Sequence, residues 1–136
     1  MPFQHDMPIM FGDCDPFGIV FYPNYFRWMD NTFHMMCAAA GFSQTDLPAH
    51  GIKGTPLRDV GAEFHSPARA GDTLTISAEI AEFTRSSLKV AYRLSIGERL
   101  VATGHELRIF VKEKDGGIAS ARAPEPIREM LAPYTA

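Results

Sequence analysis

Two aspartates and an expected helix start lie close together near the beginning of the chain. Asp13 and Asp15 are two residues apart, so in an extended segment their carboxylates leave the same side of the backbone. Pro16 and Gly18 then turn the chain, because proline has no N–H to donate and glycine tolerates positive φ. Pro23 is suited to the first position of a helix, whose free N–H groups carry partial positive charge. A carboxylate beside such donors suits attack on an acyl group.

Two other interpretations of these aspartates stay open. Asp15, next to proline and near glycine, is typical of an aspartate that bonds its own backbone in a turn. Asp13 is expected to cap the turn that follows rather than to react. The Asp-Cys-Asp run with its glycine also imitates the opening of an EF-hand calcium loop. However, Phe17 and Asn24 occupy positions where that loop needs side-chain oxygens, so calcium is not expected.

The other reactive side chains form no second constellation. Metal ligation is not expected, because no HxxxH or HxxE grouping joins the histidines His34, His50, His65 and His105. Cys14 has no histidine nearby to act as a base and is expected to be inert. The absence of a GxSxG sequence argues against a serine hydrolase. Cys14 and Cys37 form no CxxC pair, which predicts free thiols in a reducing compartment.

Length and composition predict one globular domain over residues 1–136. Hydrophobic residues make up 46% of the chain and charged residues 21%, which is ordinary for a soluble protein. The net charge of −3 shows no block of like charges, so neither nucleic acid nor a membrane surface is an expected partner. The first residues lack the regions of a signal peptide, and no apolar run approaches the roughly 20 residues of a membrane span. We therefore expect a cytoplasmic protein.

Hydrophobic periodicity predicts the elements of the first half. Residues 3–11 form an expected strand, which Pro8 places at a sheet edge. Residues 23–40 carry apolar side chains with a period of 3.6, which predicts an amphipathic helix ending at Gly41. Residues 43–55 are expected to be a loop.

The second half is predicted to be mainly β-structure. Alternating or apolar segments predict four strands at residues 57–65, 73–83, 88–96 and 100–111, and the tail at 126–131 a short helix. One strand, one long helix and four strands with hairpin-length connections imply an α+β fold, with an antiparallel sheet packed against a single helix. Such a sheet leaves a face and its edges uncovered, which favours an oligomer.

Three runs of sequence carry a family resemblance. They are GDCDPFGIV at residues 12–20, YPNY at 22–25 and RWMD at 27–30. They resemble the 4-hydroxybenzoyl-CoA thioesterase family of the hotdog fold, and the resemblance continues more weakly to residue 110. It implies a five-stranded antiparallel sheet curled around one long helix, an element order that agrees with the one derived from periodicity.

The resemblance also implies roles for individual positions. Asp15 matches the catalytic carboxylate, and Tyr22 matches the residue whose backbone N–H holds the thioester carbonyl oxygen. Asp30 resembles the position that meets the ring hydroxyl of a hydroxybenzoyl group, although on spacing alone it pairs with His34 one turn on. Thr55, in a Gly-Thr-Pro run, resembles a position near the acyl pocket that faces the partner subunit. The family's basic cluster for CoA phosphates is sparse here, leaving the candidates Arg85, Lys89 and Arg128.

The expected function is hydrolysis of an aromatic acyl-CoA, foremost 4-hydroxybenzoyl-CoA, with no metal or organic cofactor. Asp15 either attacks the carbonyl carbon or deprotonates water, and the sequence leaves both routes open. The expected partners are the acyl-CoA and further copies of the chain in a dimer or tetramer. The alternatives are a thioesterase for short aliphatic acyl-CoA or acyl carrier protein esters, a hotdog protein that binds acyl-CoA without hydrolysis, and a hotdog hydratase.

Overall fold

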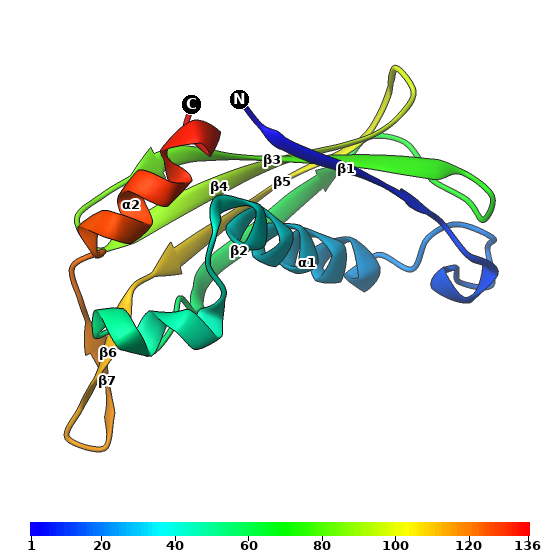
Figure 1. Cartoon of the computed structure of the whole chain (residues 1–136). Coiled ribbons are helices and arrows are strands. Elements are labelled where there is room, and N and C mark those ends of the chain that lie inside the picture. The colour runs from blue at the N-terminus through cyan, green and yellow to red at the C-terminus, as the bar shows by residue number, and fades with distance from the viewer.

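The computed structural model describes all 136 residues and places one long helix, α1 (Pro23–Ala40), against a five-stranded antiparallel sheet (Figure 1). The strands are β1 (Phe3–Pro8), β2 (Leu57–Phe64), β3 (Thr73–Phe83), β4 (Ser87–Ile96) and β5 (Arg99–Ile109). Their order across the sheet is β1-β3-β4-β5-β2. The predicted fold class is therefore confirmed, including the edge position of β1.

Smaller elements surround this sheet. They are the 3₁₀ turns η1 (Phe11–Asp13), η2 (Gln44–His50) and η3 (Ala132–Tyr134), the hairpin of β6 (Val111–Lys114) and β7 (Gly117–Ser120), and the predicted short helix α2 (Glu125–Leu131). The two termini lie side by side, since the terminal ammonium of Met1 donates a 2.9 Å hydrogen bond to the Pro133 carbonyl. None of the helices combines the length and the apolar character that crossing a bilayer requires.

The core lies between α1 and the inner face of the sheet. Strands β3 and β4 bury every second side chain there, namely Leu74, Ile76, Ala78 and Ile80 from β3 and Leu88, Val90, Tyr92 and Leu94 from β4. The helix contributes Met29, Phe33 and Met36 to the same core. Full burial of a side chain of this size contributes about 1.5–3 kcal/mol, so the periodicity that predicts the elements also accounts for their packing.

Met29 of helix α1 lies directly over Gly104 of β5. A Cβ atom at this position would overlap the sulfur of Met29 and would lie 3.3 Å from the carbonyl oxygen of Gly61. Met29 is only 1% exposed and has little room to retreat. The missing side chain at residue 104 therefore sets how deep the helix rests on β5.

The structure corrects three of the predicted boundaries. The first strand ends at Pro8, because its partner Thr73 is the first residue of β3; Ile9 then bonds to the turn before β3, and η1 follows. The expected loop at residues 43–55 contains η2. The predicted strand over 100–111 breaks at Phe110, because this residue bonds to Ser86 and Ala121 instead of continuing the β5 ladder.

The connection between β2 and β3 also differs from the prediction. These strands do not form a hairpin, because β2 pairs with β5 at one edge of the sheet while β3 lies next to β1. Residues 65–72 therefore carry the chain from one side of the sheet to the other. This crossing passes beside the start of α1, where the Val20 N–H donates a 2.9 Å hydrogen bond to the Ala68 carbonyl.

Candidate active site

Residues 13–21 form a narrow hairpin with Asp15 near its tip. The Phe21 N–H donates a 2.9 Å hydrogen bond to the Asp13 carbonyl. The Asp15 N–H donates a 2.8 Å hydrogen bond to the Ile19 carbonyl. These bonds hold Asp15 in a defined turn that leads directly into α1.

The Asp15 carboxylate takes part in this turn with one of its two oxygens. Its Oδ1 accepts a 2.9 Å hydrogen bond from the Phe17 N–H, and its carbonyl accepts a 2.9 Å bond from the Gly18 N–H. Gly18 has φ +81°, the left-handed conformation that favours glycine. The self-bonded turn left open by the sequence is thus present. It leaves Oδ2 without a hydrogen bond inside the chain, so a half-buried carboxylate oxygen is still available for chemistry.

Asp13 is placed differently from the expectation. Its carboxylate accepts a 2.8 Å hydrogen bond from the Met10 N–H, so it caps η1, of which it is the last residue, and not the turn that follows. Both aspartates therefore bond to backbone amides. The chain contains no group of three or more His, Cys, Asp and Glu side chains arranged to hold a metal ion.

The start of α1 offers one free amide, that of Tyr22. Pro23 has no N–H. The Asn24 N–H donates to the Phe21 carbonyl at 2.9 Å, and the Tyr25 N–H donates to the Tyr22 carbonyl at 3.1 Å. The Tyr22 N–H itself makes no hydrogen bond within the chain. The expected set of several free donors is therefore wrong, and the one that remains belongs to the residue that the family resemblance nominates.

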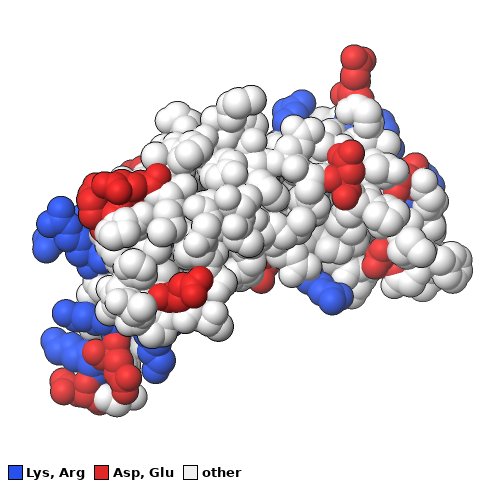
Figure 2. All heavy atoms as spheres, viewed as in Figure 1, with Lys and Arg blue, Asp and Glu red and all other residues white.

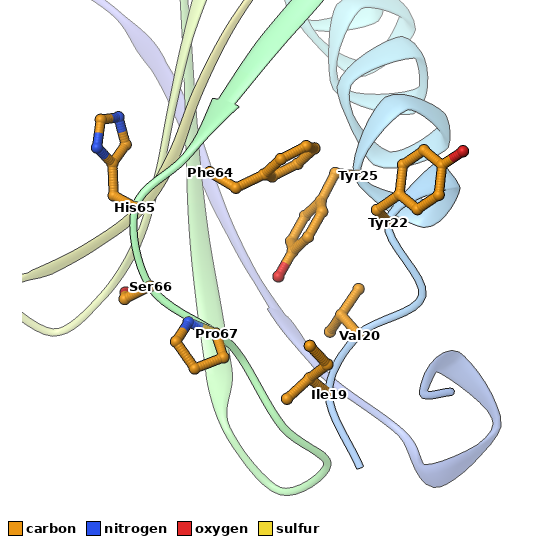
Figure 3. A pocket seen from close by; sticks show the side chains of 8 residues that line it. All are labelled: Ile19, Val20, Tyr22, Tyr25, Phe64, His65, Ser66 and Pro67. Atoms are coloured by element: carbon orange, nitrogen blue, oxygen red, sulfur yellow. The ribbon is translucent and has the colours of Figure 1, made fainter. Parts of the chain in front are cut away.

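A cavity of about 510 Å³ lies beside this amide, between the hairpin and the loop after β2 (Figure 3). It is lined by Ile19, Val20, Tyr22, Tyr25, Phe64, His65, Ser66 and Pro67. The rings of Tyr25 and Phe64 lie next to each other, with their centroids 5.5 Å apart. The Tyr22 hydroxyl points away from the other lining side chains (Figure 3). The wall of the cavity therefore suits a flat apolar group.

Burial affects one titratable side chain of the cavity wall and one cysteine of the core. Burial raises the pKa of Tyr25, so its hydroxyl keeps its proton. Both cysteines are free, as predicted. Burial also raises the pKa of Cys37 to about 12, so it is a thiol at neutral pH. Asp15 does not line the cavity, but it is joined through its N–H to Ile19, which does.

Asp30 lies about 12 Å further along α1 than Tyr22, at 1.5 Å per residue. Its Oδ1 accepts a hydrogen bond of 2.5 Å from Arg108. The predicted contact with His34 is also present, with Nε2 3.6 Å from the same oxygen. The Asp30 side chain remains 42% exposed, and its Oδ2 has no hydrogen bond within the chain.

Thr55 is buried and its polar groups are already paired. Its hydroxyl accepts a 3.0 Å hydrogen bond from Gln44 Nε2, and its N–H donates to Gln44 Oε1 at 3.2 Å. Its carbonyl accepts a 3.1 Å bond from Arg108. Thr55 also lines a second cavity of about 410 Å³ together with His34 and Arg108. The structure thus brings Thr55 close to Asp30 through a shared arginine.

The candidates for CoA phosphate contacts lie away from the helix start. Arg85 is exposed in the turn between β3 and β4, and Lys89 is exposed on the outer face of β4. This turn lies at the opposite end of the molecule from the first residues of α1 (Figure 1). Arg128 is tied to the protein, since it donates a 2.6 Å bond to the Thr84 carbonyl and lies 4.2 Å from the ring centroid of Phe83.

Sequence reasoning missed a buried polar cluster beneath α1. The Tyr92 hydroxyl donates a 2.5 Å hydrogen bond to Glu106 Oε1, and Arg108 Nε donates to the same oxygen at 3.2 Å. Burial raises the pKa of Glu106. The sequence contains one signal for this cluster. Glu106 and Arg108 are two residues apart on β5, so they lie on the same face of the strand as Gly104, which is the face that packs against α1.

A curled sheet packed on one helix, with an acidic turn and a free amide at the helix start, defines a hotdog-fold enzyme. The family model described as Thioesterase superfamily matches residues 17–103. The chain is 34% identical to the 4-hydroxybenzoyl-CoA thioesterase of Pseudomonas sp. (strain CBS-3), with 91% of this chain and 93% of that protein covered. This chain therefore belongs to the thioesterase superfamily and is a thioester hydrolase.

Solved structures of related enzymes agree with this assignment. The structure of the Pseudomonas 4-hydroxybenzoyl-CoA thioesterase matches with a TM-score of 0.85 and 32% identity, covering 95% of this chain and 98% of that one. A gentisyl-coenzyme A thioesterase matches with a TM-score of 0.82 and 30% identity, covering 95% and 99%. The chain is thus similar along nearly its whole length to enzymes whose names specify aromatic CoA thioesters.

Proposed function

We propose that this chain hydrolyses an aromatic acyl-CoA, with 4-hydroxybenzoyl-CoA as the expected substrate, to the free acid and CoA. The observation that carries the proposal is the unpaired N–H of Tyr22, which lies beside an aromatic cavity and directly follows the hairpin that holds Asp15, a carboxylate with one unengaged oxygen. The names of the similar enzymes from Pseudomonas and of the gentisyl-CoA thioesterase support an aromatic acyl group.

In the proposed mechanism the carbonyl oxygen of the thioester accepts a hydrogen bond from the Tyr22 N–H. One such donor is worth roughly 10²–10³ in rate, because it stabilises the negative charge that develops on this oxygen. Asp15 Oδ2 then either attacks the carbonyl carbon, which releases the CoA thiolate and gives a mixed anhydride that water hydrolyses to the free acid and the restored carboxylate, or takes a proton from a water that attacks the same carbon and displaces the thiolate. A thiolate leaves readily, so neither route requires a metal ion or an organic cofactor.

The acyl group is proposed to lie along α1 from Tyr22 towards Asp30. Phe26 and Asp30 follow Tyr22 at intervals of four residues, so all three project from the same face of the helix. Phe26 packs edge-on against Phe64, with the ring centroids 6.4 Å apart, and extends the aromatic wall in that direction. Asp30 Oδ2 is the proposed acceptor for the ring hydroxyl. A charge-assisted bond of about 1.5–3 kcal/mol favours the hydroxylated ester by about 10- to 150-fold.

A dimer or larger oligomer is part of the proposal. Edge strand β2 exposes Leu57, Val60 and Phe64 by 43%, 42% and 50%, and an apolar unpaired edge is a template for pairing with another chain. Phe64 also lines the cavity at the helix start, so a second copy on β2 would border the active site.

The cellular location of the protein and its contacts with the nucleotide of CoA are also part of the proposal. Charged side chains leave much of the visible face free, and basic and acidic side chains gather at the end that carries the β6–β7 hairpin (Figure 2). Because the turn between β3 and β4, which carries Arg85, lies at the opposite end of the molecule from the helix start (Figure 1), we assign Arg85 and Lys89 to the nucleotide of a substrate bound by a neighbouring copy. A cytoplasmic location fits the two free thiols.

A panel of thioesters tests the proposal directly. The full chain is assayed for thiol release from 4-hydroxybenzoyl-CoA, benzoyl-CoA, a short aliphatic acyl-CoA and an acyl carrier protein ester. We expect the highest kcat/KM for 4-hydroxybenzoyl-CoA. Preferential turnover of the aliphatic or carrier-protein esters would reject the aromatic assignment. Thermal stabilisation by acyl-CoA without thiol release would reject hydrolysis.

A further inference from the structure

We propose that Arg108 is a positioning residue that fixes the Asp30 carboxylate and thereby selects hydroxylated aromatic acyl groups. The inference rests on the proposed function, because it deepens the assignment of Asp30 to the ring hydroxyl. It is carried by a set of contacts that joins α1, the loop before β2 and β5.

The guanidinium of Arg108 is held by three hydrogen-bonding partners. It donates to Asp30 Oδ1 on α1, to the Thr55 carbonyl at 3.1 Å and to Glu106 Oε1 at 3.2 Å. Its Cζ lies 4.0 Å from the ring centroid of Phe33, and the residue is only 4% exposed. A planar group with donors engaged in several directions and an aromatic ring against it has one orientation.

Glu106 and Tyr92 support that orientation from below. Glu106 is fully buried, and its Oε1 receives hydrogen bonds from both Tyr92 and Arg108. Its other oxygen, Oε2, has no hydrogen-bond partner. Arg108 is therefore the charged group that pairs with Glu106 in the core. A buried charge that loses its partner is strongly disfavoured, and Arg108 is therefore retained at this place.

These contacts restrain the carboxylate of Asp30, which is part-exposed on the surface of α1. Arg108 engages Oδ1 and leaves Oδ2 as the acceptor. An aspartate without this partner would have to give up rotamer freedom on accepting a hydrogen bond from a substrate. Arg108 restricts the rotamer of Asp30 before the substrate binds, so a ring hydroxyl finds its hydrogen-bond acceptor already oriented. Each of the three guanidinium nitrogens of Arg108 already donates a hydrogen bond within the chain, which makes it a poor ligand for a substrate carboxylate in its own right.

The test compares the ratio of kcat/KM for 4-hydroxybenzoyl-CoA to that for benzoyl-CoA in Arg108→Met, Arg108→Lys and Asp30→Asn. We expect the ratio to fall by about tenfold or more in Arg108→Met, mainly through a raised KM for the hydroxylated ester, with both constants for benzoyl-CoA retained. Lysine should restore little, because it lacks the planar fork. In the Asp30→Asn background, Arg108→Met should leave the ratio unchanged. Arg93→Met, an exposed site on β4, is the matched control.

Each other outcome overturns the proposal. An unchanged ratio in both Arg108 variants, with a reduced ratio in Asp30→Asn, rejects positioning but keeps the hydroxyl contact. Equal losses on both esters show a merely structural role. A wild-type enzyme with equal kcat/KM on the two esters rejects the hydroxyl contact as well, and no thiol release from either rejects the aromatic thioesterase function itself.

A milder variant serves if Arg108→Met fails to fold in a thermal unfolding assay. Tyr92→Phe removes one hydroxyl and its hydrogen bond to Glu106 while keeping the ring. The ratio should then fall in the same direction by a smaller factor. An unchanged ratio in the folded Tyr92→Phe protein overturns the proposal.

Discussion

Replacing Asp15 with asparagine separates the structural use of this side chain from its chemical use. Oδ1 holds the turn by accepting the hydrogen bond from the Phe17 N–H, and the amide oxygen of asparagine accepts the same bond. Asp15→Asn therefore keeps the turn but removes the negative charge that a nucleophile or a base requires. Asp15→Ala removes both. The two variants together distinguish the turn-forming aspartate from the catalytic one.

The expected magnitudes differ sharply between activity and stability. A positioned acid or base contributes about 10²–10⁴ in rate, or roughly 2.7–5.5 kcal/mol of transition-state stabilisation at 1.36 kcal/mol per tenfold. Loss of the bond to the Phe17 N–H in Asp15→Ala should lower the free energy of unfolding by about 0.5–1.5 kcal/mol. That corresponds to a Tm lower by roughly 2–5 °C for a domain of this size. Asp15→Asn should show the loss of rate without the loss of Tm.

The assay measures thiol release from 4-hydroxybenzoyl-CoA, calorimetric binding of this ester to the inactive variant, and thermal unfolding. Asp13→Asn is the control, because the Asp13 carboxylate only accepts a hydrogen bond from the N–H of Met10, the residue before η1, and asparagine can keep it. Turnover of Asp15→Asn near the wild-type value would refute a catalytic role for Asp15. A Tm as low as that of Asp15→Ala would refute the role assigned to the turn.

Three further predictions concern the scaffold. Gly104→Ala should lower the free energy of unfolding by about 1–3 kcal/mol through overpacking against α1, and equal stability of Gly104→Ala and Gly12→Ala, which has open space, would contradict this. Burial lowers the pKa of His5 below 6.5, so the unfolded chain binds the proton more tightly and the free energy of unfolding should fall as the pH drops through 6.5. Urea titrations should show a smaller fall in His5→Gln, and identical pH profiles would argue against the assignment. Val60→Lys on the exposed edge of β2 should shift the protein towards monomer in sedimentation experiments, and an unchanged oligomer would exclude pairing through this edge.

The sequence predicts elements whose signals are local. Helix α1 begins at Pro23 and ends at Ala40 as predicted, because proline at the first position and glycine after the last are signals within the helix itself. Gly41 adopts φ +113° at this end. The position of β2 was not predictable in the same way, because its partner β5 follows it by two intervening strands. Nothing in the alternation of β2 indicates which edge of the sheet it occupies.

The residues of the candidate site also differ in whether their signals in the sequence are local or long-range. Asp15 and Tyr22 were nominated by a short contiguous resemblance, whereas Arg108 acts through residues on α1, on β5 and in the loop before β2. Such a contact requires the tertiary arrangement and cannot be seen in the spacing of one segment. The number of free amides was also missed, because the carbonyls of Phe21 and Tyr22 close the first turn of the helix on itself. The strength of a helix start as a donor site depends on these local bonds as much as on its partial charge.

The distance between Tyr22 and Asp30 along α1 is proposed to select the length of the acyl group. The proposed chemistry occurs at the Tyr22 amide and the proposed recognition at Asp30, about 12 Å further along the helix axis. Both residues belong to one helix, whose depth is set by Gly104 and whose Asp30 is fixed to β5 by Arg108. The distance between the Tyr22 amide and the Asp30 carboxylate is therefore fixed. A short aliphatic acyl group can reach Tyr22 without reaching Asp30, whereas a ring with a distal hydroxyl can use both, and in the proposed mechanism this difference favours an aromatic ester.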